Sequence, residues 1–128
     1  MVSLALLDVR LAAQLRENPR RCEGVKVVAE AATLDALRSQ AAAREAQVLV
    51  VSVEQLGNEP DVAVLELAKS FQAELTLITY YFAKREVIAR FAGPQRRTLR
   101  GPISLDGLRA QLTSLLVRDK LASNGSAI

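Results

Sequence analysis

Five short apolar runs, each about the length of a β-strand, alternate along this 128-residue chain with segments whose apolar residues recur at helical spacing. The central runs are apolar at consecutive positions, which is typical of strands that are covered on both faces, as in a parallel sheet. Parallel strands need long crossover connections, and the helical segments supply them. The runs are Val2–Leu7, Val25–Ala29, Val48–Val51, Leu75–Ile78 and, more weakly, Thr98–Leu99.

A helical pattern follows each apolar run. Thr33 and Ser104 are placed to cap the second and the fifth helix, and Gly93 and Pro94 end the fourth. The apolar residues of the five patterns are, in chain order, Leu11 and Leu15; Leu34, Leu37 and Ala41; Val64, Leu67, Ala68 and Phe71; Val87, Ile88 and Phe91; and Leu105, Leu108, Leu112, Leu115 and Leu116.

The order strand-helix, repeated five times, predicts a single doubly wound α/β domain. For a chain of this length we expect a flavodoxin-like architecture, with a five-stranded parallel sheet in the order 2-1-3-4-5 and five helices. We expect the domain to span residues 1–119. Residues 120–128 have the composition of a linker and are expected to form a C-terminal tail or the start of a linker to an output domain.

The composition excludes several kinds of chemistry. The chain has one cysteine and no histidine, which removes histidine-based zinc sites, Ser-His-Asp triads and Cys-His pairs within it. No glycine-rich loop follows the first strand, so a nucleotide site is not expected. No apolar run approaches the roughly 20 residues of a membrane helix, and the N-terminus is a poor signal peptide. We therefore expect a cytoplasmic protein that is not an enzyme and has no catalytic residues, metal or cofactor.

Four stretches together resemble a response-regulator receiver domain over residues 4 to about 116. Leu4–Arg10 is similar to the family's first strand with its acidic end, and Gln47–Ser52 to the strand that ends at the phosphoacceptor aspartate. Leu75–Thr79 matches the strand that ends at the switch threonine or serine, and Leu99–Leu105 the stretch that normally reads Leu-x-Lys-Pro-Ile-Ser. The similarity is strongest to receivers that precede a helix-turn-helix output domain.

The resemblance implies a degenerate phosphoacceptor pocket made of Asp8, Val9, Ser52, Thr79 and Gly101. In the family, three acids hold Mg²⁺, one of them accepts the phosphoryl group, and a lysine neutralises it. Here Val9 replaces one acid, Ser52 the phosphoacceptor and Gly101 the lysine. A single remaining carboxylate should hold Mg²⁺ weakly, and a serine without an adjacent base is a poor nucleophile.

Two further features of this pocket stay open at the level of sequence. Glu54 either lends a second carboxylate to the pocket or points to solvent. Thr98 stands where the family has its aromatic switch residue, whereas Tyr80 and Tyr81 directly follow Thr79. We expect the usual coupling of threonine and aromatic residue to be broken, or rebuilt with different residues.

Two surfaces are candidates for contacts. Five arginines are expected on the fourth helix, the loop after it and the fifth strand, the face that receivers use for dimerisation or docking. This is either a solvated basic face or a surface for an acidic partner, an anion, or DNA beside an attached DNA-binding domain. The alternative is the face of the first and last helices, since the last helix is more apolar than one sheet face requires. The residues are Arg85, Arg90, Arg96, Arg97 and Arg100 for the first surface, and Leu112 and Leu116 for the second.

These observations favour an atypical receiver, a phosphorylation-independent regulatory, dimerisation or protein-interaction module of a bacterial transcription regulator with a C-terminal helix-turn-helix domain. Its partners would be a second copy or another protein, with DNA bound only through the attached domain and no membrane partner. The alternative is a small-molecule sensor that uses the modified pocket between Asp8, Ser52, Thr79 and Tyr80. A small enzyme of the same fold is disfavoured because a base, a nucleophile and a phosphate loop are missing.

Overall fold

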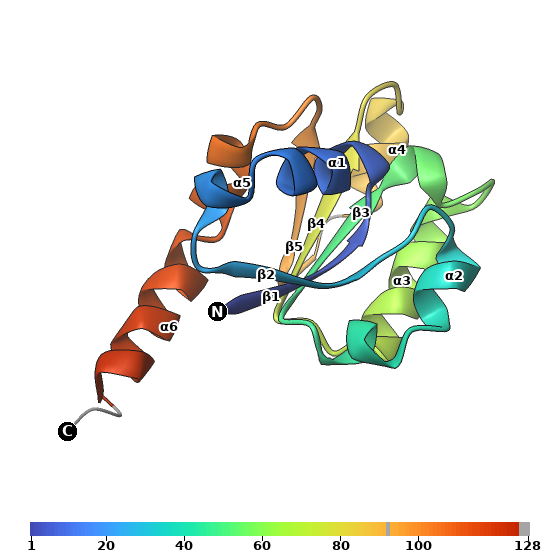
Figure 1. The fold of residues 1–128 in the computed structure, drawn as a ribbon. Helices are drawn as coiled ribbons and strands as arrows, with labels where there is room; N and C mark the ends of the chain where they lie inside the picture. Colours follow the sequence, from blue (N-terminus) through green and yellow to red (C-terminus); the bar gives the residue numbers. More distant parts are fainter. Residues whose placement is uncertain (92, 126–128) are drawn as a thin grey trace.

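The computed structural model describes residues 1–91 and 93–125, which form one sheet with helices on both faces (Figure 1). The strands are β1 (Val2–Leu7), β2 (Val25–Glu30), β3 (Val48–Ser52), β4 (Leu75–Tyr80) and β5 (Arg96–Arg100). The helices are α1 (Val9–Glu17), α2 (Leu34–Arg38), α3 (Pro60–Ser70), α4 (Arg85–Ala89), α5 (Leu105–Gln111) and α6 (Thr113–Gly125), with short 3-10 helices at Pro19–Cys22, Ala41–Glu45 and Val53–Gln55.

The sheet has the order β2-β1-β3-β4-β5, and every neighbouring pair is parallel. This confirms the predicted doubly wound α/β class and the predicted strand order. The register pairs Leu7 with Val51 and Ser52 with Thr79. The carboxyl ends of β1, β3 and β4 therefore meet at one edge of the sheet, where ligands of such sheets bind.

The core lies in two layers, one on each face of the sheet. On one face, Ala5 and Leu7 of β1 pack with buried residues of α2 and α3, among them Leu37 and Leu67. On the other face, Leu4 and Leu6 pack with Leu11 of α1, Leu108 of α5 and Leu112, which follows α5. Both faces are covered, which is why the central strands are apolar at consecutive positions.

Both predicted N-caps are confirmed. The Thr33 hydroxyl accepts a hydrogen bond from the Ala36 N–H at 3.3 Å, and the Ser104 hydroxyl accepts one from the Gly107 N–H at 2.9 Å. Each satisfies one of the backbone donors that a helix leaves unpaired at its start.

The prediction of five helices is wrong, because the described residues contain six α-helices. The segment expected as one final helix divides at Leu112, whose backbone leaves the helical region at φ −98° and ψ 4°. Leu112 is fully buried, and the bend keeps it in the core while α6 turns away from the domain (Figure 1).

Helix α6 continues through residues 120–125, where we expected a tail; residues 126–128 lie outside the described part of the chain. Two ion pairs join α6 to residues that directly precede strands. Arg118 lies 2.5 Å from Glu74, before β4, and Asp119 lies 3.1 Å from the amino group of Met1, before β1. Within the described ranges, no helix is long and apolar enough to cross a membrane.

Candidate functional site

Asp8 lies directly after β1 and closes the start of α1. Its Oδ1 atom accepts the Leu11 N–H at 3.1 Å, and its Oδ2 atom accepts the Thr79 hydroxyl at 2.7 Å. Asp8 is only 5% exposed and Thr79 only 1%. The two residues that the resemblance identified as retained are thus brought together, as a buried hydrogen-bonded pair in which both carboxylate oxygens are engaged.

Ser52 ends β3 and is buried beside this pair, and its hydroxyl donates to Oε2 of Glu54 at 3.1 Å. The other carboxylate oxygen of Glu54 accepts the N–H groups of Tyr81 at 2.6 Å and Phe82 at 3.2 Å. The sequence left open whether Glu54 lends a carboxylate to the pocket or points to solvent. In the structure Glu54 is exposed, and its carboxylate is bound by Ser52 and by the loop between β4 and α4.

The ionisation of Glu54 follows from these bonds. Partial burial acts to raise its pKa, but hydrogen bonds from the backbone N–H groups of Tyr81, Glu54 itself and Phe82, and from the Ser52 hydroxyl, outweigh that effect and lower the pKa. A carboxylate with a lowered pKa is a weak general base. Its contact with Ser52 therefore does little to activate that hydroxyl as a nucleophile.

Gly101, which the resemblance aligns with the lysine of receivers, lies against the aromatic ring of Tyr81. A Cβ atom at residue 101 would lie 2.5 Å from Cζ of Tyr81, so only glycine leaves room for the ring where it lies. The guanidinium of Arg10 lies 4.2 Å from the centre of the same ring, within cation–π distance. The Tyr81 ring thus lies in contact with both Gly101 and Arg10.

Val9, in place of the second acid, keeps only its backbone in the site. Its side chain is 48% exposed, and its N–H donates to Oε1 of Gln55 at 3.0 Å. The amide group of Gln55 in turn donates to the Ala32 carbonyl at 3.0 Å. Gln55 therefore links the loops that follow β1, β2 and β3, a role that the sequence analysis missed.

The residues at this edge of the sheet do not fit the Mg²⁺ ion that receivers bind. The Asp8 carboxylate is engaged by Leu11 and Thr79, and the Glu54 carboxylate is engaged by backbone amides. The part of the chain that the structure describes contains no group of three or more His, Cys, Asp or Glu side chains that could hold a metal ion. Mg²⁺ demands several oxygen ligands in near-octahedral geometry, and this donor set does not offer them.

The five arginines of the predicted basic face do not form one cluster. Residues alternate between the two sides of a strand, so Arg97 points toward α5 and donates to Gln111 at 3.1 Å. Arg90 pairs with Asp61 of α3 at 3.9 Å. Arg85 and Arg100, by contrast, line the same cavity; Arg96 is half-buried on β5.

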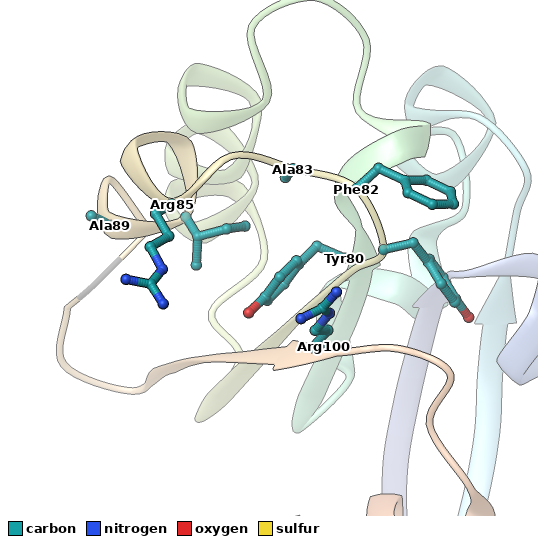
Figure 2. Close-up of a pocket in the computed structure, with 8 residues that line it drawn as sticks. Tyr80, Phe82, Ala83, Arg85, Ala89 and Arg100 are labelled. Carbon is teal, nitrogen blue, oxygen red and sulfur yellow. The ribbon is translucent and has the colours of Figure 1, made fainter.

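That cavity has a volume of about 770 Å³ and lies between α4, β5 and the loop that follows β4 (Figure 2). Figure 2 shows Arg85 reaching down from α4 and Arg100 on β5, with the Tyr80 ring between them in this view. Ile88 adds an apolar wall. The cavity therefore combines apolar surface with two arginines.

The sequence analysis placed a ligand pocket between Asp8, Ser52, Thr79 and Tyr80, and this location stays a prediction. Asp8, Ser52 and Thr79 are each at most 5% exposed. Tyr80, in contrast, lines the cavity beside α4 and β5.

The apolar interface predicted on the last helix also needs correction. Leu112 is fully buried in the core of its own domain and offers no surface to a partner. Leu116 is half-buried against the same layer, with its side chain next to Gly24. The exposed apolar side chains of α6 are Val117 and Leu121, at 53% and 64% exposure.

Comparison of the structure with solved structures places the fold. The arrangement is that of a receiver domain: five parallel strands in the order 2-1-3-4-5 between two helical layers. The signal receiver domain of a protein described as a Luxo repressor, from Vibrio parahaemolyticus, is similar with a TM-score of 0.64 and 14% sequence identity, over 94% of this chain and 92% of that chain. The sequence itself matches no protein-family model and no curated protein.

Proposed function

We propose that this chain is an atypical receiver domain that regulates through contacts with other proteins, without being phosphorylated. The observation that carries the proposal is the Tyr81 ring over Gly101, which fills the side of the pocket where a phosphoryl group would need a cation. Loss of such a fixed charge costs several kcal/mol of transition-state stabilisation, ~3 kcal/mol for a single donor. Ser52 is only 5% exposed, which also supports the proposal.

The partners follow from the same proposal. The structural neighbour is described as the receiver domain of a repressor, which supports a role in transcription regulation, with a C-terminal helix-turn-helix domain as the output. DNA would then be bound through that domain. The receiver-like domain itself would contact a second copy or a protein partner, and the cavity flanked by Arg85 and Arg100 is the surface that we assign to this contact.

The test is incubation with acetyl phosphate, or with beryllofluoride, in the presence of Mg²⁺, followed by intact mass and NMR spectra. A receiver that retains its phosphoacceptor aspartate serves as the positive control, and Ser52→Ala as the matched variant. We expect no adduct and no shifts around residue 52 in this chain. A stable adduct that the Ser52→Ala variant does not form would overturn the proposal.

A second candidate function, a small-molecule sensor, is favoured by the cavity itself. Its volume of about 770 Å³ falls within the range of ligand pockets, and two arginines beside Tyr80 suit a small anion with an aromatic ring. Binding raises the melting temperature by mass action. A thermal-shift series with benzoate and phenyl phosphate, on the native chain and on Arg85→Ala with Arg100→Ala, tests this function. No stabilisation of the native chain counts against it.

A further inference from the structure

Three hydrogen-bond donors converge on the carboxylate of Glu54. The Tyr81 N–H donates to Oε1 at 2.6 Å and the Phe82 N–H to the same oxygen at 3.2 Å, while the Ser52 hydroxyl donates to Oε2 at 3.1 Å. Glu54 belongs to the 3-10 helix after β3, whereas the two amides belong to the loop between β4 and α4. One side chain therefore joins two loops that are 27 and 28 residues apart in sequence.

These contacts are those of a bound anion. Two consecutive backbone N–H groups and a hydroxyl are donors that carboxylates and phosphates share as ligands. The guanidinium of Arg10, held against the Tyr81 ring at 4.2 Å, adds a positive charge to the same loop. Because hydrogen bonds lower the pKa of Glu54, its carboxylate is charged at neutral pH and the bonds are charge-assisted.

We propose that Glu54 is the built-in ligand of an anion site formed by the N–H groups of Tyr81 and Phe82 and the hydroxyl of Ser52, and that its presence there holds the loop between β4 and α4 in one conformation. A small oxyanion from solution would use the same donors and order the same loop. Here the chain supplies the oxyanion itself, so the loop is held permanently. This inference goes beyond the proposed function and stands whichever partner the domain contacts.

The loop that Glu54 holds shapes the neighbouring surface. Phe82 is 88% exposed, and in Figure 2 its ring points away from Arg85. Tyr80, the last residue of β4, and Ala83 of the loop line the cavity between α4 and β5. Fixing the two amides therefore fixes both the display of Phe82 and one wall of the cavity.

The first test measures amide hydrogen exchange in Glu54→Ala. We expect exchange at Tyr81 and Phe82 to accelerate roughly tenfold or more, the low end of what a hydrogen bond to a charged group contributes. Exchange at Ile78, in the core of β4, should not change. The matched control is Glu59→Ala, at the N-cap position of α3, where the side chain makes no capping hydrogen bond.

The second test asks whether the site takes an anion from solution. Inorganic phosphate, titrated into Glu54→Ala, should shift the amide resonances of Ser52, Tyr81 and Phe82 saturably, while the native chain and Glu59→Ala stay unchanged. Glu54→Gln keeps the shape and one acceptor oxygen, and should give an intermediate exchange rate. Unchanged exchange in Glu54→Ala, or equal phosphate shifts in the native chain, would overturn the inference. If Glu54→Ala does not fold, Glu54→Gln decides by the same two measurements.

Discussion

The hydroxyl of Thr79 donates a 2.7 Å hydrogen bond to the Oδ2 atom of Asp8, across 71 residues of sequence. The other carboxylate oxygen of Asp8 accepts the Leu11 N–H at the start of α1. One buried carboxylate thus joins the end of β1, the first turn of α1 and the end of β4. These two hydrogen bonds give Asp8 a role in the stability of the fold.

Asp8→Ala should lower the free energy of unfolding substantially, because it removes a helix cap and leaves a buried hydroxyl with a weaker partner. The cap contributes ~1 kcal/mol, and a buried polar group that loses its partner costs about 1–3 kcal/mol. Thr79 retains only its 3.3 Å contact with the Val51 carbonyl. Urea denaturation should therefore show a loss of about 2–4 kcal/mol.

The matched control for this prediction is Asp35→Ala, at an exposed carboxylate in the first turn of α2. An exposed position of this kind should change stability by no more than about 0.5 kcal/mol. If Asp8→Ala and Asp35→Ala were equally mild, the Asp8–Thr79 bond would not be the structural link described here.

Gly101→Ala should displace the Tyr81 ring, because the new Cβ would lie 2.5 Å from Cζ of that ring. The ring is the free end of a side chain and moves at small cost, so the main loss is its contact with Arg10. An exposed cation–π contact of this kind is worth ~0.5–1 kcal/mol. NMR should show the shift at the Tyr81 ring protons. In a Tyr81→Ala background, Gly101→Ala should leave the free energy of unfolding almost unchanged. An equal loss of stability in both backgrounds would show that the Tyr81 ring is not what the new Cβ displaces.

The backbone of this fold was predictable from the sequence, whereas the side-chain contacts at its edge were not. The strand positions follow from runs such as Val48–Val51, since burial on both faces leaves an apolar residue at every position. The direction of the Glu54 carboxylate depends on amides 27 and 28 residues further along the chain. No local pattern carries that information, and the contact of the Tyr81 ring with Gly101 was not predicted either.

The arginines show a second limit, and one that sequence reasoning could have avoided. Arg97 and Arg100 were assigned to one face, yet an odd separation on a strand places two side chains on opposite sides. Applied to β5, this rule separates Arg97, which contacts α5, from Arg100, which lines the cavity. The position of Leu112, in contrast, could not have been decided from the sequence. An apolar stripe on a helix does not show whether its residues face the core or a partner, and Leu112 is fully buried in the core.

Glu54 should also give the protein a measurable pH dependence. Its pKa is lowered in the folded chain from the ordinary value of 4.5, so the folded state favours the ionised form. The resulting stabilisation is complete above pH 4.5 and is lost as the pH falls through the lower pKa of the folded state. The melting temperature of the native chain should exceed that of Glu54→Gln at neutral pH, and the difference should shrink below pH 4.5. A difference that stays constant with pH would mean that ionisation of Glu54 does not stabilise the fold.

Arg85 and Arg100 should determine how the cavity between α4 and β5 binds an acidic partner. The described residues place no carboxylate in an ion pair with either guanidinium, whereas Arg90 is paired with Asp61. Charges that are not neutralised within the chain accelerate association with an opposite charge and are screened by salt. The Ile88 side chain in the same cavity offers an apolar contact. A peptide that alternates glutamate with leucine should therefore bind there, as measured by fluorescence anisotropy.

Reversal of both charges, Arg85→Glu with Arg100→Glu, should weaken this binding about tenfold or more at low salt, mostly through slower association. The matched control is Arg20→Glu with Arg44→Glu, which makes the same change in net charge at two exposed arginines outside the cavity. If only the net charge of the chain mattered, both double variants would bind the peptide equally weakly. That result would contradict the prediction that the peptide binds at the cavity. Weaker binding in Arg85→Glu with Arg100→Glu, but not in the control, would show that these two side chains contact the peptide. The difference should disappear at high salt, because salt screens the attraction between exposed charges.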